Sequence, residues 1–227
     1  MSGAGDLAGK VVLVTGASGG LGGAIARAAA GSGAQVVASG RNLRRLGQLF
    51  DQVTAAGGQI QLYPMDLEGA EPADHQQLID ALLAEYGRLD AVVHCAADFP
   101  GLTPLAHADP AAIARALHVN LTARLWLTQA ALPLLQANGG RVLFVLDAAQ
   151  RAQQAYWGGY GLAQAAQHGL VAMLQAETVN TGVHVLALQP GPMPTALRAR
   201  AYGHEVEPIE RPLTVAGRCV AMLAAVA

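Results

Sequence analysis

Three glycines near the N-terminus, Gly16, Gly20 and Gly22, have the spacing of a loop that binds phosphate. They follow the apolar run Val11–Val14, which suits a strand buried on both faces of a parallel sheet, and they lead into the alanine-rich stretch Ala24–Ala30, which suits a helix. Because glycine has no Cβ, the backbone can turn sharply and approach a ligand closely. The unpaired N–H groups at the start of the helix then point at the anion. The loop predicts nucleotide binding; a plain strand–helix turn is the simpler alternative.

The wider pattern of this loop is Thr-Gly-x-x-x-Gly-x-Gly, and it resembles the short-chain dehydrogenase/reductase family. The resemblance spans nearly the whole chain and implies a Rossmann-type sheet that binds a nicotinamide cofactor. Within the family it resembles bacterial YciK-type reductases, through the segments 39–42, 88–90 with His94, and 195–199. It also implies which loop residues contact the cofactor: Gly16, Ser18, Gly20, Leu21 and Gly22.

The residues after the second expected strand indicate which cofactor binds. That strand ends at Ser39-Gly40 and is followed by Arg41. An acid at the position of Gly40 would bond a ribose 2′-hydroxyl and repel a 2′-phosphate. Arg41 instead offers a guanidinium, which pairs with phosphate. We therefore expect NADP(H) to be preferred over NAD(H); the alternative for Arg41 is a solvated charge at a strand end.

Other segments match family positions that contact the cofactor. Asp66-Leu67 corresponds to the adenine-contacting pair, and Pro190 and Thr195 correspond to the Pro-Gly-x-x-x-Thr segment near the nicotinamide. An Asp after a strand is also an ordinary turn residue, and a proline-rich loop is also a stiff turn. Where the family has Asn-Asn-Ala-Gly, this chain has His-Cys-Ala-Ala, which retains only Ala96.

The family's catalytic tetrad of Asn, Ser, Tyr and Lys is matched only in part. The corresponding residues here are Asn120, Asp147, Tyr160 and Gln164. The resemblance makes Tyr160 the residue that protonates the substrate oxygen, and makes Tyr160 and Gln164 cofactor contacts as well. The two residues are four apart and share one helix face. The alternative for Asn120 is a polar residue that distorts its helix and bonds to backbone or water.

The two substitutions weaken the expected proton relay. A free phenol has a pKa near 10, and bringing it to about 7 requires roughly 4 kcal/mol. In the family the lysine lowers that pKa and holds the nicotinamide ribose, whereas Gln164 has no charge. An ionised Asp147 would raise the phenol's pKa further, while a protonated one could donate a hydrogen bond as serine does.

Two basic residues could replace the missing cation. His168 lies two turns beyond Tyr160, about 12 Å along the helix axis at about 1.5 Å per residue, which is too far for direct contact. Arg151 follows Asp147 in a loop. It stays an alternative, although a loop arginine is usually solvated.

The sequence supports three hypotheses of function. The first is an NADP(H)-dependent oxidoreductase that reduces carbonyls or oxidises alcohols by hydride transfer with an impaired relay. The second is a catalytically inactive protein that senses cofactor or binds a partner, and the third is a structural dimer with an empty cleft.

The elements that must position these residues alternate between strand and helix, which predicts one α/β domain over residues 1–227 with a doubly wound parallel sheet. The expected strands are Val11–Thr15, Gln35–Ser39, Gln59–Tyr63, Ala91–His94, Arg141–Leu146 and Val183–Leu188. The expected helices are Leu21–Gly31, Leu43–Ala56, Ala73–Tyr86, Ala111–Gln136, Tyr156–Thr181 and Leu213–Ala225. Loops over about 97–110 and 189–212 follow strands and are expected to wall the substrate. The sequence ends at Ala227, so we expect six strands without the family's usual seventh.

Composition limits the possible partners. The net charge is −2, which argues against nucleic acid, and no run is long enough for a membrane helix. Hydrophobic residues make up 52% and charged residues 13% of the chain, which favours apolar surface buried between subunits. The family resemblance implies a homodimer through the two long helices, Ala111–Gln136 and Tyr156–Thr181. We expect a cytoplasmic protein with a small carbonyl or alcohol substrate, two reduced cysteines and no metal site.

Overall fold

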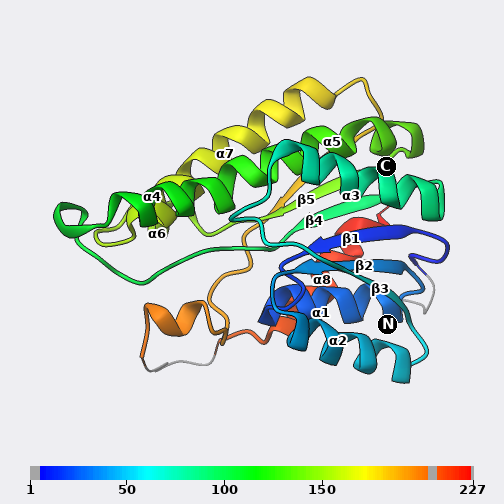
Figure 1. The fold of residues 1–227 in the computed structure, drawn as a ribbon, viewed down its shortest axis with the longest axis horizontal. Helices are drawn as coiled ribbons and strands as arrows, with labels where there is room; N and C mark the ends of the chain where they lie inside the picture. Colours follow the sequence, from blue (N-terminus) through cyan, green and yellow to red (C-terminus); the bar gives the residue numbers. More distant parts are fainter. Residues whose placement is uncertain (1–5, 204–208, 226–227) are drawn as a thin grey trace.

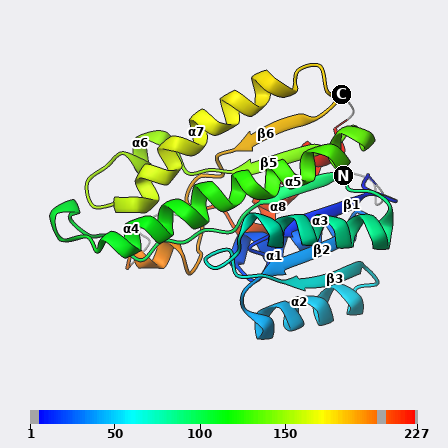
Figure 2. The same cartoon turned by 45° about the horizontal axis from the view of Figure 1, so that its top comes forward.

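The computed structural model describes residues 6–203 and 209–225 and contains one parallel sheet of six strands. The strand order is β3-β2-β1-β4-β5-β6, so β1 lies inside the sheet and β3 and β6 lie at its edges (Figure 2). The strands are β1 (Val11–Thr15), β2 (Gln35–Gly40), β3 (Gln59–Pro64), β4 (Ala91–His94), β5 (Arg141–Val145) and β6 (His184–Leu188). The predicted fold class is confirmed, and each strand boundary lies within one residue of its expected place.

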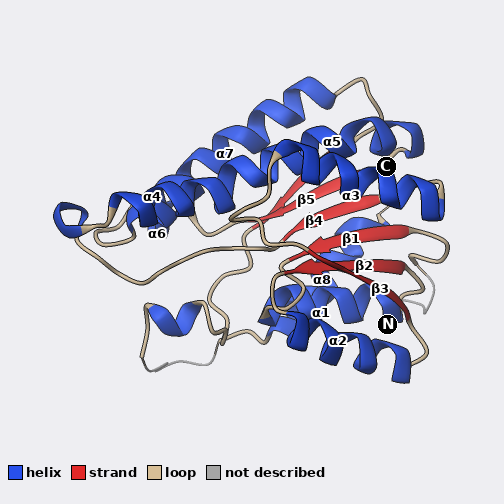
Figure 3. Ribbon diagram, in the orientation of Figure 1, coloured by secondary structure: helices blue, strands red, loops and turns tan. Residues whose placement is uncertain are grey.

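Helices cover both faces of the sheet because successive residues of a buried strand point to opposite sides. Val12 and Val14 face the layer formed by α1, α2 and α8, whereas Val11 and Leu13 face α3, α5 and α7. Figures 1 and 3 show these two layers below and above the strands. The long helices are α1 (Gly20–Gly31), α2 (Leu43–Ala55), α3 (Pro72–Tyr86), α4 (Pro110–Leu117), α5 (Ala123–Asn138), α7 (Gly158–Thr178) and α8 (Pro212–Ala224).

The single helix expected over Ala111–Gln136 is wrong, because a π-helical segment, η2 (His118–Thr122), separates α4 from α5. The main-chain N–H of Ala123 bonds to His118 O, five residues back. Within η2 the side chain of Asn120 donates to Ala116 O at 2.7 Å, which competes for a carbonyl of the helix. Such segments are single-turn insertions in an α-helix and are frequent at functional sites.

Two glycines of the phosphate loop are required by close approaches within the protein itself. Gly16 has φ +68°, and a Cβ on it would lie 2.6 Å from the Cα of Ala96. A Cβ on Gly22 would lie 2.3 Å from Gly16 O. These contacts bring α1 and the segment after β4 tightly against the loop that follows β1.

Three short helices lie in segments expected to be irregular: η1 (Leu105–His107), α6 (Ala149–Ala152) and η3 (Arg198–Arg200). They have four residues or fewer, which is too short for a periodic pattern of apolar residues to reveal them. None of the helices in the described residues combines the length and hydropathy needed to cross a membrane. Both cysteines, Cys95 and Cys219, are free thiols, as expected.

Candidate active site

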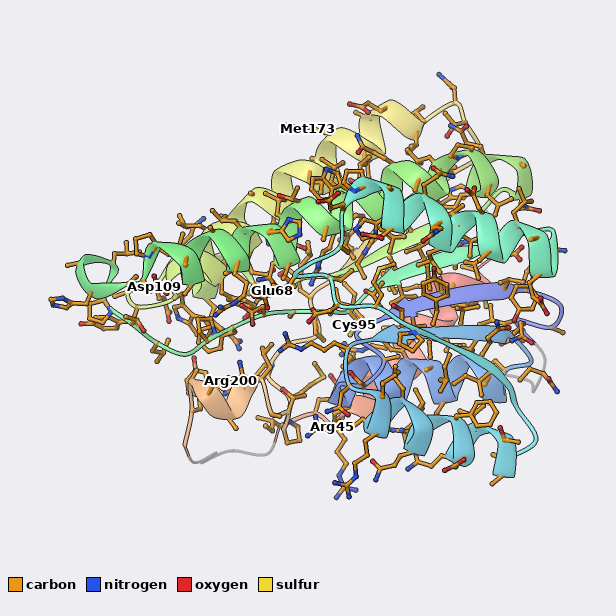
Figure 4. The ribbon with its side chains drawn as sticks, in the orientation of Figure 1. Arg45, Glu68, Cys95, Asp109, Met173 and Arg200 are labelled. Atoms are coloured by element: carbon orange, nitrogen blue, oxygen red, sulfur yellow. The ribbon has the colours of Figure 1, made fainter. Side chains whose placement is uncertain are left out.

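A cavity of about 460 Å³ opens where the parallel strands end. This edge of a doubly wound sheet is where ligands bind in such folds. It is lined by every residue that we expected to contact cofactor: Gly16, Ser18, Gly20, Leu21, Gly22, Arg41, Asp66, Leu67, Ala96, Tyr160, Gln164, Pro190 and Thr195. Asp147 also lines the cavity, as do Ala97–Phe99 and Tyr202 from the two expected substrate loops. In Figure 4, Cys95 lies near the strand ends and Arg45 lies below it on α2.

The start of α1 suits a pyrophosphate group. Its N-cap, Gly19, has no side chain to bond the free N–H groups, and the first turn contains no acidic residue. A Cβ on Gly20 would lie 3.3 Å from the side-chain methyl of Thr195, so the segment after β6 closes over this helix end. The residues present therefore fit the phosphates of a dinucleotide.

Arg41 lines the cavity directly after β2, where it pairs with two acids. Its Nη1 lies 3.8 Å from Glu68 Oε2 and 4.0 Å from Asp66 Oδ1, and its side chain is 54% exposed. Exposed ion pairs of this kind contribute little, so the guanidinium is free to turn toward a ligand phosphate. Gly40, the residue before Arg41, packs tightly against the phosphate loop, since a Cβ there would lie 2.9 Å from Ser18 Oγ.

The segment after β4 is held by Thr15 rather than by the family's asparagine. The Thr15 hydroxyl donates to Val93 O at 3.3 Å and accepts from the N–H groups of Cys95 at 3.2 Å and Ala96 at 3.4 Å. Burial raises the pKa of the Cys95 thiol to about 12, so the thiol stays protonated. His94 is buried against Phe144 with ring centroids 4.6 Å apart, which is a structural role.

Asn120 is the one expected catalytic residue that does not line the cavity. It is buried, and in the part of the chain that the structure describes its amide bonds only to backbone. Nδ2 donates to Asp98 O at 2.8 Å as well as to Ala116 O, while Oδ1 accepts from Asp98 N at 3.0 Å. The side chain of Asp98 accepts in turn from Arg115 Nε at 3.3 Å. Asn120 therefore anchors the first substrate loop to η2, which matches the alternative of a polar residue bonded to backbone.

Asp147 is held by three side chains from one face of α7. Its N–H donates to Gln164 Oε1 at 2.9 Å, and its carbonyl accepts from His168 Nε2 at 3.1 Å. The Tyr160 hydroxyl lies 3.5 Å from Asp147 Oδ2, the outer limit of a hydrogen bond. His168 thus contacts the backbone of Asp147, although it lies two helical turns beyond Tyr160.

Arg151 is not solvated as a loop arginine usually is. The short helix α6 places it four residues after Asp147, and its Nε lies 3.5 Å from Asp147 Oδ1. The same oxygen accepts from the N–H of Ala148 at 2.8 Å. Both donors contact the same carboxylate oxygen, so the guanidinium of Arg151 pairs with Asp147 rather than with Tyr160.

The Tyr160 hydroxyl sits in an aromatic pocket of the cavity wall. The ring lies 5.2 Å from Phe99 and 5.8 Å from Trp157 between centroids. Burial raises the pKa of Tyr160 above its usual value, and the charge of Asp147 raises it further, against smaller opposing effects of Arg124 and Arg151. The phenol is therefore neutral at physiological pH.

Arg124 is a site residue that the sequence analysis missed. It lies on α5 and is 1% exposed, and it lines the cavity beneath Tyr160 and Gln164. A signal did exist, because a single arginine interrupts the otherwise apolar run 123–127 four residues after Asn120, on the same helix face.

A sequence pattern of the family described as short chain dehydrogenase matches residues 10–205. The chain belongs to the short-chain dehydrogenase family. The uncharacterized oxidoreductase YciK of Escherichia coli K12 is 33% identical over 198 residues, which cover 86% of this chain and 78% of YciK.

Solved short-chain dehydrogenases share this fold and, in two cases, contain a nicotinamide cofactor. A short-chain dehydrogenase of Shigella flexneri 2a strain 301 complexed with NADP is 30% identical with a TM-score of 0.91, covering 98% of this chain and 93% of that one. Another from E. coli CFT073, complexed with NADPH, is 32% identical with a TM-score of 0.89, covering 96% and 91%.

Proposed function

We propose that this short-chain dehydrogenase is an NADP(H)-dependent oxidoreductase of small carbonyl compounds and their alcohols, with an impaired proton relay. The observation that carries the proposal is that the phosphate loop and Tyr160 open on one cavity. The relatives complexed with NADP and NADPH support the choice of cofactor.

The proposed roles follow from where the residues lie. The cofactor, when bound, supplies the hydride. The N–H groups at the start of α1 hold the pyrophosphate, and Arg41 holds the 2′-phosphate. Tyr160 donates its proton to the carbonyl oxygen, while Asp98–Phe99 and Tyr202 shape the substrate side of the cavity.

Two features of the site support a slow reaction. A carboxylate stands where the family has a serine hydroxyl, and the amide of Gln164 is used by the backbone of Asp147. Burial and then the charge of Asp147 raise the pKa of the Tyr160 phenol, and Gln164 has no charge to lower it. A neutral phenol still donates a proton, whereas alcohol oxidation needs a phenolate, so reduction is expected to exceed oxidation.

The proposal is tested by titrating the protein with NADPH and NADH, followed by a panel of aldehydes, ketones and quinones. Binding with measurable NADPH oxidation supports it. Binding without turnover on any carbonyl favours the alternative, a protein that senses cofactor or binds a partner. Absence of cofactor binding contradicts both.

Replacing Arg41 with alanine is expected to weaken NADPH binding about tenfold and to leave NADH binding unchanged, because only NADPH has a 2′-phosphate to pair with a guanidinium. The measurement is a fluorescence titration of both cofactors. Arg44→Ala is the matched control, since Arg44 is exposed on α2 but does not line the cavity. Equal losses for the two cofactors would show that Arg41 does not select between them.

We also propose a homodimer through the two long helical segments expected over 111–136 and 156–181, which form α4, α5 and α7; α4 and α7 pack against each other. On α7, Leu162 is 52% and Met173 is 64% exposed, and Met173 projects away from the sheet in Figure 4. Light scattering is expected to give twice the 23.2 kDa chain mass, and the double change Leu162→Glu with Met173→Glu to give the monomer. Leu43→Glu on α2, where Leu43 is 66% exposed, should leave the dimer intact.

A further inference from the structure

The buried guanidinium of Arg124 has only uncharged hydrogen-bond partners among the described residues. Nη1 donates to Gln167 Oε1 at 2.6 Å and to Val145 O at 3.2 Å, and Nη2 donates to Ala96 O. Nε has no partner within residues 6–203 and 209–225. Two strand ends and one helix therefore converge on a positive charge that none of the described carboxylates pairs with.

Burying a guanidinium without a carboxylate partner lowers the stability of the folded protein. The effective penalty for burying one ion is several kcal/mol, and carbonyl dipoles repay only part of it. Burial lowers the pKa of Arg124 to about 10, so the group stays charged at neutral pH. A charge held in a low dielectric acts strongly on its neighbours, and Tyr160 is among the groups that interact electrostatically with it.

Arg124 contacts α7, the helix that contains Tyr160 and Gln164, through its bond to Gln167. Tyr160, Gln164 and Gln167 follow one another along one buried face of α7, and the first two line the cavity. The amide oxygen of Gln164 is occupied by the N–H of Asp147, and that of Gln167 is occupied by Arg124 itself. The face of α7 that contains the family's lysine position thus has two neutral amides here, and the positive charge reaches the same place from α5.

We propose that Arg124 is the cation of this active site, taking over from α5 the electrostatic role that a lysine at position 164 would have. The inference rests on the proposed function. In carbonyl reduction a hydride adds to the carbonyl carbon, the C=O π electrons move to oxygen, and that oxygen takes the Tyr160 proton. The phenolate left on Tyr160 then recovers a proton from solvent. Arg124 stabilises the negative charge on the substrate oxygen and on Tyr160 through space, as a positioning residue.

The test is a cycle of three variants: Arg124→Met, Gln164→Lys and both together. Arg124→Met is expected to lower kcat about 10- to 100-fold with KM for NADPH within about threefold. Gln164→Lys alone adds a second buried cation, so it is expected to lower the Tm of the cofactor-free protein by about 5 °C and to give no gain in kcat. In the double variant the new lysine replaces the lost charge, and kcat should return to within about fivefold of the parent.

A purely structural Arg124 gives a different result. A lysine at position 164 cannot refill the bonds to Ala96 O and Val145 O, so a double variant as slow as Arg124→Met overturns the proposal. Additive Tm changes across the cycle overturn it too. The Tm cycle needs no cofactor, so it decides the inference even if no carbonyl is turned over, whereas loss of the proposed function appears as absent NADPH binding by the parent. If Arg124→Met does not fold, Arg124→Gln removes the charge while keeping a donor.

Discussion

Replacing Gly20 with aspartate is expected to weaken the binding of NADPH and NADH by at least about 100-fold while the cofactor-free protein stays folded. Gly20 is the first residue of α1, where no side chain caps the helix. A carboxylate there is favourable for the helix, because anions stabilise helix N-termini, but it occupies and repels the site of a pyrophosphate. Isothermal titration with both cofactors, together with a thermal melt, measures the two effects separately.

Gly20→Ala is the matched control for size. Its Cβ would lie 3.3 Å from the methyl group of Thr195, whose flexible side chain can shift. Affinity is expected to stay within about fivefold of the parent. An aspartate variant that binds both cofactors like the parent would show that the start of α1 does not hold the pyrophosphate.

Replacing Asp147 with serine is expected to raise kcat for carbonyl reduction about 10- to 100-fold, the usual range for assistance by an acid or base. The pKa of Tyr160 is raised first by burial and then by the charge of Asp147, so removing the carboxylate lowers that pKa. A phenol of lower pKa is the stronger acid toward the substrate oxygen. The measurement is NADPH oxidation at saturating carbonyl.

The effect of Asp147 on the pKa of Tyr160 is also expected to appear in the pH dependence of alcohol oxidation. Alcohol oxidation needs the phenolate of Tyr160, so its rate is expected to rise with pH throughout the alkaline range in the parent. In Asp147→Ser this rise should begin about one pH unit lower. Asp147→Asn is the control, since it keeps the shape and removes the charge; a profile that moves in serine but not in asparagine would assign the gain to the hydroxyl rather than to lost repulsion.

The fold and the cofactor loop could be predicted because their signals are local. Apolar runs alternate with helical segments along the chain. Gly16, which packs against Ala96, and Gly22, which packs against Gly16, both belong to the recognisable glycine spacing of the phosphate loop. Arg41 and Tyr160 could likewise be placed at the cavity from their distance to the nearest strand or motif.

The electrostatics of the site could not be predicted, because they depend on side chains distant in sequence. Arg124 contacts Gln167, 43 residues later, and its bond to Ala96 O spans 28 residues. Arg151 reaches Asp147 only because α6 forms, and a four-residue helix leaves no periodic pattern. The break at η2 has the same origin, since the Asn120 amide bonds to Asp98 in a loop 22 residues away.

The attachment of Asp147 to α7 has a consequence for redesign. Gln164 and His168 bond its main-chain N–H and C=O, not its carboxylate. Exchanging the side chain at position 147 is therefore expected to leave the main chain of that residue in place, so other functional groups can be introduced at the same position. Amide, hydroxyl or thiol substituents can be compared there on one unchanged scaffold, and differences in rate would report chemistry instead of backbone rearrangement.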